Sequence, residues 1–572
     1  MKINMLTRRV TWQNLERETY DLLVIGGGIT GVGIARDATL RGLKVLLVEK
    51  SDFAAGTSSK SSKLIHGGLR YLQQAEFGLV FESVSERTLL LKLAPHLVRP
   101  MEFLVPAYRG NYPGRTMLHA GLLLYDALAK FSAPGRHRAY RAKALLKQEP
   151  MLRSERLTGG VTYFDSATDD ARLTLENALD ARRNGAHILT YARATGFVSR
   201  KDDKGNEVIE GVELRDELDP KVEATARARV IVNATGPWSD LVLRLLQRGQ
   251  PAPLLRPTKG SHIVLDAARL PVRHAVVMTT PQDHRVIFAI PWTDPDVPTA
   301  SRTVIGTTDT DYHGDPDKVA TDAADVEYLL TCANYYFPEA KLVEGDVLAT
   351  WSGLRPLVAP SAEGLSASQV SREHRLISRP GLLTIVGGKL TTYRRMAAQV
   401  VEAAYEQLGQ KAPECPTDDR PLPGAEGLLP SADAVDPISS VAMALQALEH
   451  PALDRQVCRH LAQYYGMRAL ELGRQLVSGE GVSGGGERLD PEQPYLMAEV
   501  DLAVQEEEAL RLDDVLGRRL PLLLRGRDQG LGCAERVAQR MAALLEWSPE
   551  KTASELKSYR DTVATSRQFR HK

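Results

Sequence analysis

The chain has 572 residues, too many for one hydrophobic core, so two or three domains are expected. Lys plus Arg and Asp plus Glu both number 72, which gives no basic field for nucleic acid, and no nucleic-acid partner is expected. The four cysteines lie far apart without a C-x-x-C pair, which argues against a disulfide framework, a zinc site or an iron–sulfur cluster. We therefore expect no metal site, and a reducing compartment.

Membrane-spanning segments are not evident. The first twenty residues lack the apolar core of a signal peptide, and no apolar run reaches the roughly eighteen residues of a spanning helix. The nearest candidate, 117–129, contains His119 and Asp126 and predicts a buried or interfacial helix, which a basic loop at 132–142 follows. A cytoplasmic protein that at most lies on a membrane surface is expected.

The stretch 20–50 carries the clearest motif. An apolar run at 22–25 predicts a parallel strand covered on both faces, and a helical pattern and a second apolar strand at 45–48 follow. Between strand and helix stands G-x-G-x-x-G, formed by Gly26, Gly28 and Gly31. Glu49 ends the second strand, where a carboxylate meets a ribose hydroxyl. This order predicts a dinucleotide-binding unit, and the alternative is a Gly-rich turn that binds no ligand.

Segment 51–72 is rich in Ser, Thr, Gly and Lys and ends in HGGLRY. Its place directly after the nucleotide-binding strand favours a ligand loop over a solvated linker. Two later strands also run into turns from which backbone groups can contact a cofactor, N-A-T-G-P-W at 233–238 and G-G-K-L-T-T at 387–392, and another strand leads into a Gly–Arg turn, S-G-L-R-P at 352–356.

The segments between these turns predict further layers. Helical spacing favours core-facing helices at 77–93, 117–131 and 316–340. Alternating residues at 186–232 predict an antiparallel region, and strands within 257–310 predict a substrate-facing sheet. His262 lies in that sheet, and a lone histidine is more often structural than catalytic.

The C-terminal third differs in composition. A Pro/Gly/Asp-rich break at 409–437 marks a domain boundary, and helices are expected at 438–449, 454–465, 495–517 and 533–547. We expect the charged residues 548–572 to form a loose tail.

These motifs, in this order, resemble the FAD-dependent, respiratory glycerol-3-phosphate dehydrogenases. The resemblance covers about residues 18–547, and the pairing of HGGLRYL with GGKLTTYR is highly specific within flavin oxidoreductases. It implies an α/β fold with a Rossmann-like FAD-binding domain of the glutathione-reductase and D-amino-acid-oxidase type. It also implies an inserted antiparallel β substrate domain and a C-terminal α-helical domain.

The resemblance also implies domain limits. The FAD-binding domain would be discontinuous, over 18–95, 150–255 and 345–408, and the substrate domain would take 96–149 and 256–344. The linker would span 409–437, the helical domain 438–547 and the tail 548–572.

The resemblance implies FAD as the cofactor and assigns its contacts. The residues implied to bind FAD are Gly26, Gly28, Gly31, Glu49, Thr57, Ser58, Ser59, Ser62, Lys63, His66, Gly67, Thr235, Gly236, Trp238, Gly353, Gly388, Lys389, Leu390 and Thr391.

The implied reaction oxidises sn-glycerol 3-phosphate to dihydroxyacetone phosphate by hydride transfer to FAD. Arg70, Tyr71 and Arg372 would bind the phosphate, for which guanidinium groups are suited. Arg355 would contact the substrate, and His262 is the candidate base. Arg355 and Lys389 would stabilise developing negative charge.

Electrons are expected to pass to a membrane quinone, through peripheral contact with the inner face of the cell membrane. Three alternatives stay open: a glycerol-3-phosphate oxidase that uses oxygen and makes hydrogen peroxide, an amino-acid-type oxidase, and a non-catalytic flavin-binding sensor. The oligomeric state is also open, with a homodimer as one candidate.

Overall fold

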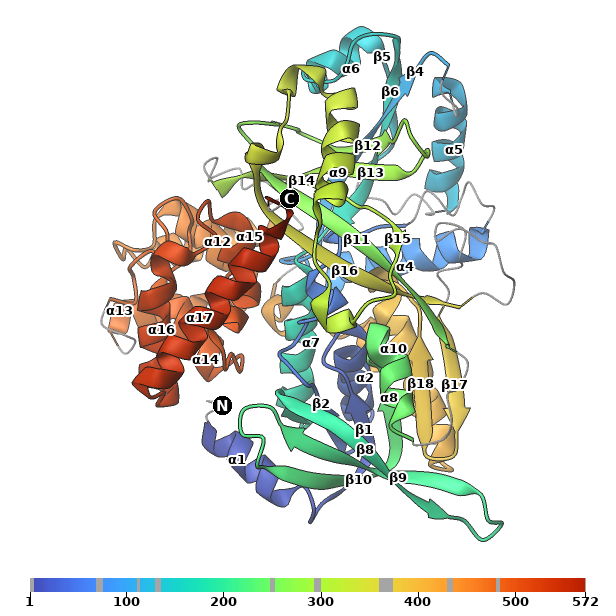
Figure 1. Ribbon diagram of the computed structural model, residues 1–572. Helices are drawn as coiled ribbons and strands as arrows, with labels where there is room; N and C mark the ends of the chain where they lie inside the picture. The colour runs from blue at the N-terminus through green and yellow to red at the C-terminus, as the bar shows by residue number, and fades with distance from the viewer. Residues whose placement is uncertain are drawn as a thin grey trace.

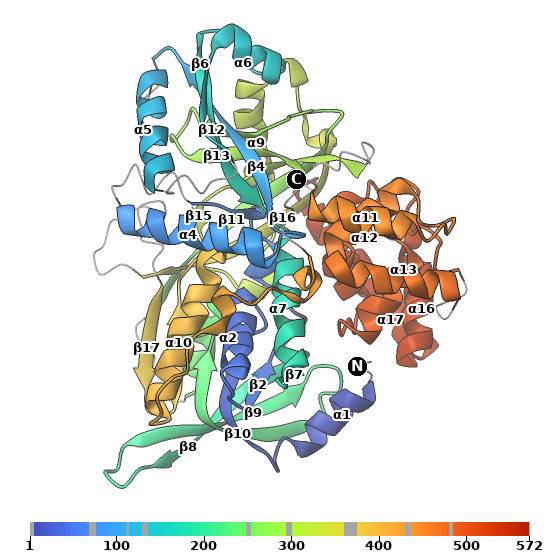
Figure 2. The same cartoon turned by 180° about the vertical axis from the view of Figure 1, so that it is seen from behind.

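The computed structural model describes residues 5–67, 76–110, 114–128, 135–246, 253–292, 300–359, 374–428, 436–479 and 484–570. These residues form two β-sheets with covering helices, and a group of C-terminal helices lies beside both sheet units (Figure 1). Figure 2 shows the same arrangement from behind, with the C-terminal helices on the side opposite to α4 and α5.

The first sheet contains the nucleotide-binding pattern. Its strands are β1 (Thr19–Ile25), β2 (Val45–Val48), β7 (His187–Leu189), β8 (Ala192–Lys201), β9 (Glu207–Asp216), β10 (Glu223–Asn233), β17 (Arg375–Arg379) and β18 (Leu382–Val386). The order is β17-β18-β10-β1-β2-β7, and β8 and β9 extend it through an antiparallel pairing with β10. β1 pairs in parallel with β2 and β10, which brings their carboxyl ends to one edge. β2 and β18 are buried along their whole length, as strands covered on both faces should be.

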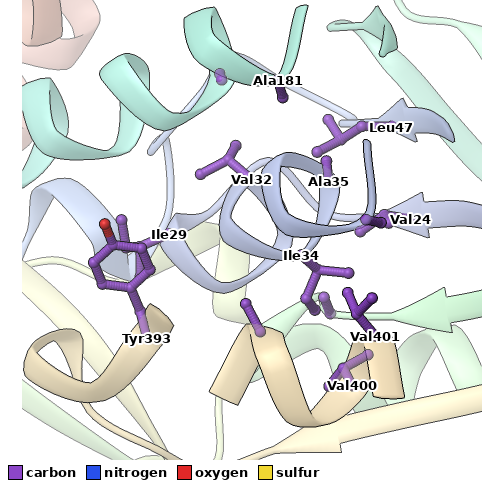
Figure 3. Packing of buried hydrophobic residues seen from close by; sticks show 14 of the residues in the cluster. Val24, Ile29, Val32, Ile34, Ala35, Leu47, Ala181, Tyr393, Val400 and Val401 are labelled. Carbon is purple, nitrogen blue, oxygen red and sulfur yellow. The ribbon is translucent and has the colours of Figure 1, made fainter. Parts of the chain in front are cut away.

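Helices cover one face of this sheet: α2 (Ile29–Leu40), α7 (Asp170–Arg183) and α10 (Tyr393–Gln407). Figure 3 shows Val24 and Leu47 of the strands close to Ala35 of α2, and Ile34 of the same helix facing Val401 of α10. α1 (Met5–Asn14) contributes Trp12 to the core on the opposite face. The nucleotide-binding strands therefore lie in the middle of a filled three-layer unit.

The second sheet is mainly antiparallel and forms the other β layer. Its strands are β3 (Leu64–Ile65), β4 (Arg99–Tyr108), β5 (Arg138–Arg141), β6 (Leu157–Ala167), β11 (Leu255–Asp266), β12 (Ala275–Thr279), β13 (Val286–Trp292), β14 (Arg302–Gly306), β15 (Thr310–Asp311) and β16 (Val347–Val358). Its helices are α4 (Phe77–Leu93), α5 (Arg115–Leu128), α6 (Ala142–Gln148) and α9 (Ala323–Tyr336). The structure has the expected α/β architecture, with a β-rich second layer and a helical C-terminal domain.

Three strands lie in a different layer from the one expected for their residue ranges. They fall within ranges assigned to the nucleotide-binding domain, yet β3 pairs with β6, β6 pairs with β4, and β16 pairs with β11 in the second sheet. The register of β16 against β11 runs from Leu255 opposite Val358 to Leu265 opposite Val347. A strand pattern in sequence indicates a strand but does not identify its partner.

The C-terminal domain consists of short helices. They are α11 (Pro437–Gln446), α12 (Arg455–Tyr465), α13 (Ala469–Ser478), α14 (Met497–Gln505), the π-helix η12 (Asp514–Arg519), α15 (Leu522–Arg525), α16 (Leu531–Leu545) and α17 (Pro549–Ser566). The helix expected at 495–517 ends at Gln505, Glu508 has a left-handed φ of +57°, and the Asp514 carboxylate accepts hydrogen bonds from the backbone N–H groups of Leu510 and Arg511. Such side-chain bonds to nearby backbone compete with a continuous helix.

The loose tail predicted at 548–572 is wrong for residues 549–570. Ser548 caps α17 by accepting from the Lys551 N–H, and Tyr559 is fully buried at 0% exposure. Farther on, Ser566 exchanges hydrogen bonds with Thr350 of β16, and Phe569 joins the core of the second sheet. Except for the buried Glu555, the charged residues of α17 face solvent, and their number hides the sparse apolar stripe in the sequence.

Candidate active site

A cavity of about 770 Å³ lies where the carboxyl ends of β1, β2 and β10 face the second sheet. Strand ends of this kind are the usual ligand-binding edge of an open α/β sheet. The cavity is lined by most of the residues that the sequence predicts as site residues, namely Gly26, Gly28, Glu49, Thr57, Ser58, Ser62, His66, Thr235, Gly236, Trp238, His262, Gly353, Arg355, Gly388, Lys389, Leu390 and Thr391.

The turn between β1 and α2 leaves no room for side chains. Gly26 has a φ of +116°, and a Cβ atom there would lie 2.7 Å from the carbonyl oxygen of Ala234. A Cβ at Gly31 would lie 1.9 Å from the carbonyl oxygen of Gly26, so helix and strand pack closely only because this residue is glycine. The N–H of Ile29, at the start of α2, donates to Ser58 Oγ over 2.9 Å. This turn has the shape and donors that a pyrophosphate requires.

Glu49 is held rigidly at the end of β2. Its Oε2 accepts from the Gly27 N–H at 2.6 Å, and its Oε1 accepts from the Ser51 N–H at 2.8 Å. Burial raises the pKa of this carboxyl, and the two N–H groups oppose the rise by stabilising the carboxylate. The carboxylate is thus fixed at the position where a ribose hydroxyl would donate to it.

His262 lies on β11 and is 2% exposed. Its ring stacks on Trp351 of β16, with centroids 4.7 Å apart, and its Nε2 is 2.9 Å from Ser62 Oγ. Among the described residues, Nδ1 has no hydrogen-bond partner. Burial lowers the pKa of His262 well below its usual value, and the charges of Arg355 and Lys63 act in the same direction. The ring is therefore neutral near pH 7 and able to accept a proton.

Arg355 and Lys389 are among the cationic residues that line the same cavity as His262. Arg355 on β16 donates to Asp309 Oδ1 at 2.9 Å, and its second terminal nitrogen donates to Thr307 Oγ1 and Thr308 O, each at 3.1 Å. These three bonds fix the plane of the guanidinium. Lys389 follows the glycine turn at the end of β18 and precedes the short helix η8 (Leu390–Thr392). The cavity thus brings a neutral base together with the positive groups of Arg355 and Lys389.

The loop after β2 contacts strand β16 and the glycine turn after β18, and the turn expected at 352–356 is wrong because β16 continues through these residues. Thr57 Oγ1 donates to the carbonyl oxygen of Leu354 at 2.7 Å, and the His66 N–H donates to Thr391 Oγ1 at 3.2 Å. At the other end of the cavity, Trp238 Nε1 donates to Asp317, and Lys50 Nζ lies 4.5 Å from the Trp238 ring centroid. Segments far apart in sequence therefore converge on one cavity, as the motifs predict.

Four predicted cofactor residues do not line the cavity. Gly31 and Ser59 are not among the lining residues, and the N–H of Gly67 donates to Asp165 Oδ1 at 3.1 Å. Lys63 points to the other side, where its Nζ forms a 2.5 Å ion pair with Asp170. A further three predicted residues, Arg70, Tyr71 and Arg372, lie outside the described residues.

The sequence prediction missed two residues at the cavity, Trp351 and Lys60. Trp351 stacks beneath His262, and the only signal for it is its place in the strand leading to S-G-L-R-P. Lys60 lines the cavity, and burial lowers the pKa of its ammonium group, as does the nearby charge of Arg518. Lys60 lies in the Ser/Lys-rich loop, but no residue spacing distinguishes it from solvated lysines.

The geometry fits a bound dinucleotide: a turn without Cβ atoms, helix N–H donors and a buried carboxylate at the ribose position. A family model described as FAD dependent oxidoreductase matches residues 21–394, which is more than half of the chain. A second model, described as the C-terminal domain of alpha-glycerophosphate oxidase, matches residues 415–552. The protein is therefore an FAD-dependent oxidoreductase with an added helical domain.

Individual relatives show which family of FAD-dependent oxidoreductases the chain belongs to. The chain is 37% identical over 561 residues to the glycerol-3-phosphate dehydrogenase of Synechocystis sp., covering 96% of this chain and 97% of the relative. It is 35% identical to the aerobic glycerol-3-phosphate dehydrogenase of Staphylococcus aureus, covering 98% of this chain and 97% of the relative. The solved glycerol-3-phosphate dehydrogenase of Bacillus halodurans, complexed with FAD, matches with a TM-score of 0.77 at 31% identity and covers 98% of each chain. The chain belongs to the FAD-dependent glycerol-3-phosphate dehydrogenase family, which confirms the resemblance and FAD as the cofactor.

Proposed function

We propose that this protein oxidises sn-glycerol 3-phosphate to dihydroxyacetone phosphate at the cavity that contains His262. The observation that carries the proposal is the combination of a buried, neutral histidine with Arg355 and Lys389 in the cavity that begins at the glycine turn. Gly26, Gly28 and Glu49 would hold the pyrophosphate and ribose of FAD. When bound, FAD supplies the acceptor for the hydride that leaves carbon 2.

His262 would take the proton of the substrate's C2 hydroxyl at Nε2, the nitrogen already 2.9 Å from Ser62 Oγ in the cavity wall. The stacking on Trp351 holds the imidazole plane, so the proton acceptor is oriented before substrate binds. Arg355 and Lys389 would stabilise negative charge as it develops at the C2 oxygen. By resemblance, Arg70, Tyr71 and Arg372 would bind the phosphate.

An anaerobic titration tests this function. Adding sn-glycerol 3-phosphate to the FAD-loaded protein without oxygen should bleach the flavin absorbance band, with dihydroxyacetone phosphate as the product. Bleaching by neutral amino acids instead would favour the amino-acid oxidase alternative. A band that none of these compounds changes would refute the dehydrogenase assignment and favour a non-catalytic flavin sensor.

For the second half-reaction we propose a membrane quinone as the electron acceptor, with oxygen as the alternative. The protein reduced by glycerol 3-phosphate should regain its flavin band rapidly on addition of a soluble quinone analogue and slowly in air. Hydrogen peroxide formed at the rate of substrate oxidation would instead identify an oxidase.

We propose that α5 and the basic segment after it contact the inner face of the cell membrane. In the part of the chain that the structure describes, no helix is long and apolar enough to span a bilayer. α5, however, leaves Met117, Leu123 and Leu124 between 45% and 52% exposed. Exposed apolar side chains beside arginines suit insertion at an anionic lipid surface.

Reversing the charge of Arg136, Arg138 and Arg141 to Glu should weaken binding to anionic phospholipid vesicles by about 100-fold at low salt, since each basic residue near such a surface contributes about 1 kcal/mol. Vesicle sedimentation measures the effect. The matched control reverses three exposed basic residues of the C-terminal domain, Arg474, Arg527 and Lys557. Unchanged vesicle binding in the first variant would refute this docking surface.

The lowered pKa of His262 predicts the pH dependence of flavin reduction. Because the base must be neutral, the anaerobic reduction rate at saturating substrate should stay level from pH 8 to about 6.5 and fall only at lower pH. Stopped-flow absorbance measures the rate, while circular dichroism verifies that the protein stays folded. In His262→Gln the residual rate of flavin reduction should not change with pH over this range. A wild-type rate that has already fallen to half of its pH 8 value at pH 7 would contradict a neutral His262.

A further inference from the structure

The loop at 51–63, which follows Glu49, is held by a part of the chain more than 450 residues away. This loop supplies much of the cavity wall, including Thr57, Ser58 and Lys60. Between Glu49 and these residues stands Asp52, which is 0% exposed and does not line the cavity. Its carboxylate points away from the cavity wall, toward the C-terminal helical domain.

Both oxygens of the Asp52 carboxylate bind arginines of η12. Arg519 forms a bidentate pair, with Nη1 2.6 Å from Oδ2 and Nη2 2.8 Å from Oδ1. Arg518 Nε adds a third bond of 2.7 Å to Oδ2. Arg519 is itself only 2% exposed and also donates to the carbonyl oxygen of Glu507. The ion pair is therefore a buried, planar contact that fixes both the distance and the orientation of Asp52 relative to η12.

A second attachment reaches the same loop at Ser51, between Glu49 and Asp52. Tyr191 Oη donates to Asp514 Oδ1 at 2.6 Å, and Arg518 donates to the same oxygen at 2.6 Å. The backbone N–H of Tyr191 in turn donates to the carbonyl oxygen of Ser51 at 2.9 Å. The π-helix η12 thus fixes two successive residues at the start of the loop, Asp52 directly and Ser51 through Tyr191.

The acidic and basic side chains around η12 stabilise one another's charges. Asp52, Asp513 and Asp514 face Arg518 and Arg519 in a setting with little water, and the charge of Lys60 lies near Arg518 and Asp513. Removing one member of such a buried cluster leaves another charge without its partner. The cluster should therefore hold loop 51–63 in one arrangement or release it as a unit.

We propose that the C-terminal helical domain retains the cofactor, with Asp52, Arg518 and Arg519 as positioning residues for the cavity loop. This inference rests on the proposed placement of FAD in the cavity. These residues do not contact the cavity themselves. They determine how often the loop opens, and so how fast FAD leaves.

The test compares two Arg→Lys variants of the holoenzyme. Arg519→Lys keeps the positive charge at η12 but removes the bidentate pair of hydrogen bonds to Asp52. The matched control is Arg172→Lys, because Arg172 is equally buried and forms a bidentate pair with Glu507 across the same domain interface, at 2.7 and 2.5 Å. The control leaves Asp52 and its partners in place. Release of FAD after dilution is followed by the recovery of free-flavin fluorescence, and thermal unfolding is recorded for both.

We expect both variants to lose thermal stability, but FAD release to accelerate about tenfold or more in Arg519→Lys alone. Tyr191→Phe removes one hydroxyl from the second attachment and should accelerate FAD release by a smaller factor, with little loss of thermal stability. This variant replaces Arg519→Lys in the test if Arg519→Lys does not fold. Equal acceleration in Arg519→Lys and Arg172→Lys would overturn the proposal, as would unchanged release in both Arg519→Lys and Tyr191→Phe.

The same samples separate this inference from the proposed function. If glycerol 3-phosphate fails to bleach the flavin of the wild-type protein, the proposed reaction is wrong, whereas the FAD release rates still report on the loop. If bleaching is normal and the release rates do not separate the variants, the reaction stands and the retention role of the C-terminal domain fails.

Discussion

Replacing His262 with Ala should slow the anaerobic reduction of the flavin by about 10² to 10⁴-fold, the range that removal of a positioned general base gives. The neutral ring lies within the cavity wall, is oriented by its stack on Trp351, and has Nε2 directed at Ser62. The loss should appear in the maximal reduction rate, with little change in the substrate concentration for half saturation, because proton transfer belongs to the chemical step. Stopped-flow reduction over a range of substrate concentrations measures both quantities.

The matched control for this prediction is His96→Gln. His96 is also fully buried, and burial lowers its pKa to about 4, but it does not line the cavity. The control should reduce the flavin at the wild-type rate even if the protein becomes less stable. If His262→Ala also retains the wild-type rate, another group is the base. A rise in the half-saturating concentration alone would make His262 a binding residue.

Gly31→Ala should destabilise the protein by about 3 kcal/mol or more and abolish its retention of FAD. The added methyl group would lie 1.9 Å from the carbonyl oxygen of Gly26 and 3.5 Å from a methyl group of Val24, so α2 must move away from β1. That movement would withdraw the helix N–H groups from the pyrophosphate position. Thermal unfolding and the ratio of flavin to protein absorbance after purification measure the two effects.

Gly78→Ala is the control for the same chemical change. Gly78 lies in α4, where an added Cβ would have no neighbour within 4 Å, and alanine favours a helix over glycine. This variant should keep its FAD and be as stable as the wild type or slightly more so. Retention of FAD and wild-type stability in Gly31→Ala as well would contradict the close packing of helix on strand.

The nucleotide-binding half of the site was predictable because its signals are local. Gly26, Gly28 and Glu49 lie within one strand–helix–strand unit, whose period and glycine spacing follow from the backbone geometry that the turn requires. The later turns at 233–238 and 387–392 were also found, because each joins an apolar strand to glycines. Their convergence on one cavity follows from parallel strands whose carboxyl ends share an edge.

What the sequence did not predict depends on contacts between distant segments. β6 and β16 have the pattern of strands, but only packing decides which sheet they join. Lys63 stands among residues that line the cavity, yet Asp170 attracts its ammonium group to the opposite side. The helix ends at Gln505 and is followed by Glu508 with a left-handed φ of +57° and by backbone N–H groups that donate to the Asp514 carboxylate, contacts that no residue pattern indicates.

The course of the chain after α16 has a consequence for synthesis in the cell. Ser566 and Phe569 complete the contacts around Thr350 and the core of the second sheet, although β16 is made more than 200 residues earlier. While the chain emerges from the ribosome, this part of the sheet stays without its final cover until residue 570 has been added. A transcript that ends early would therefore yield a protein with an exposed apolar surface, which chaperones and proteases recognise.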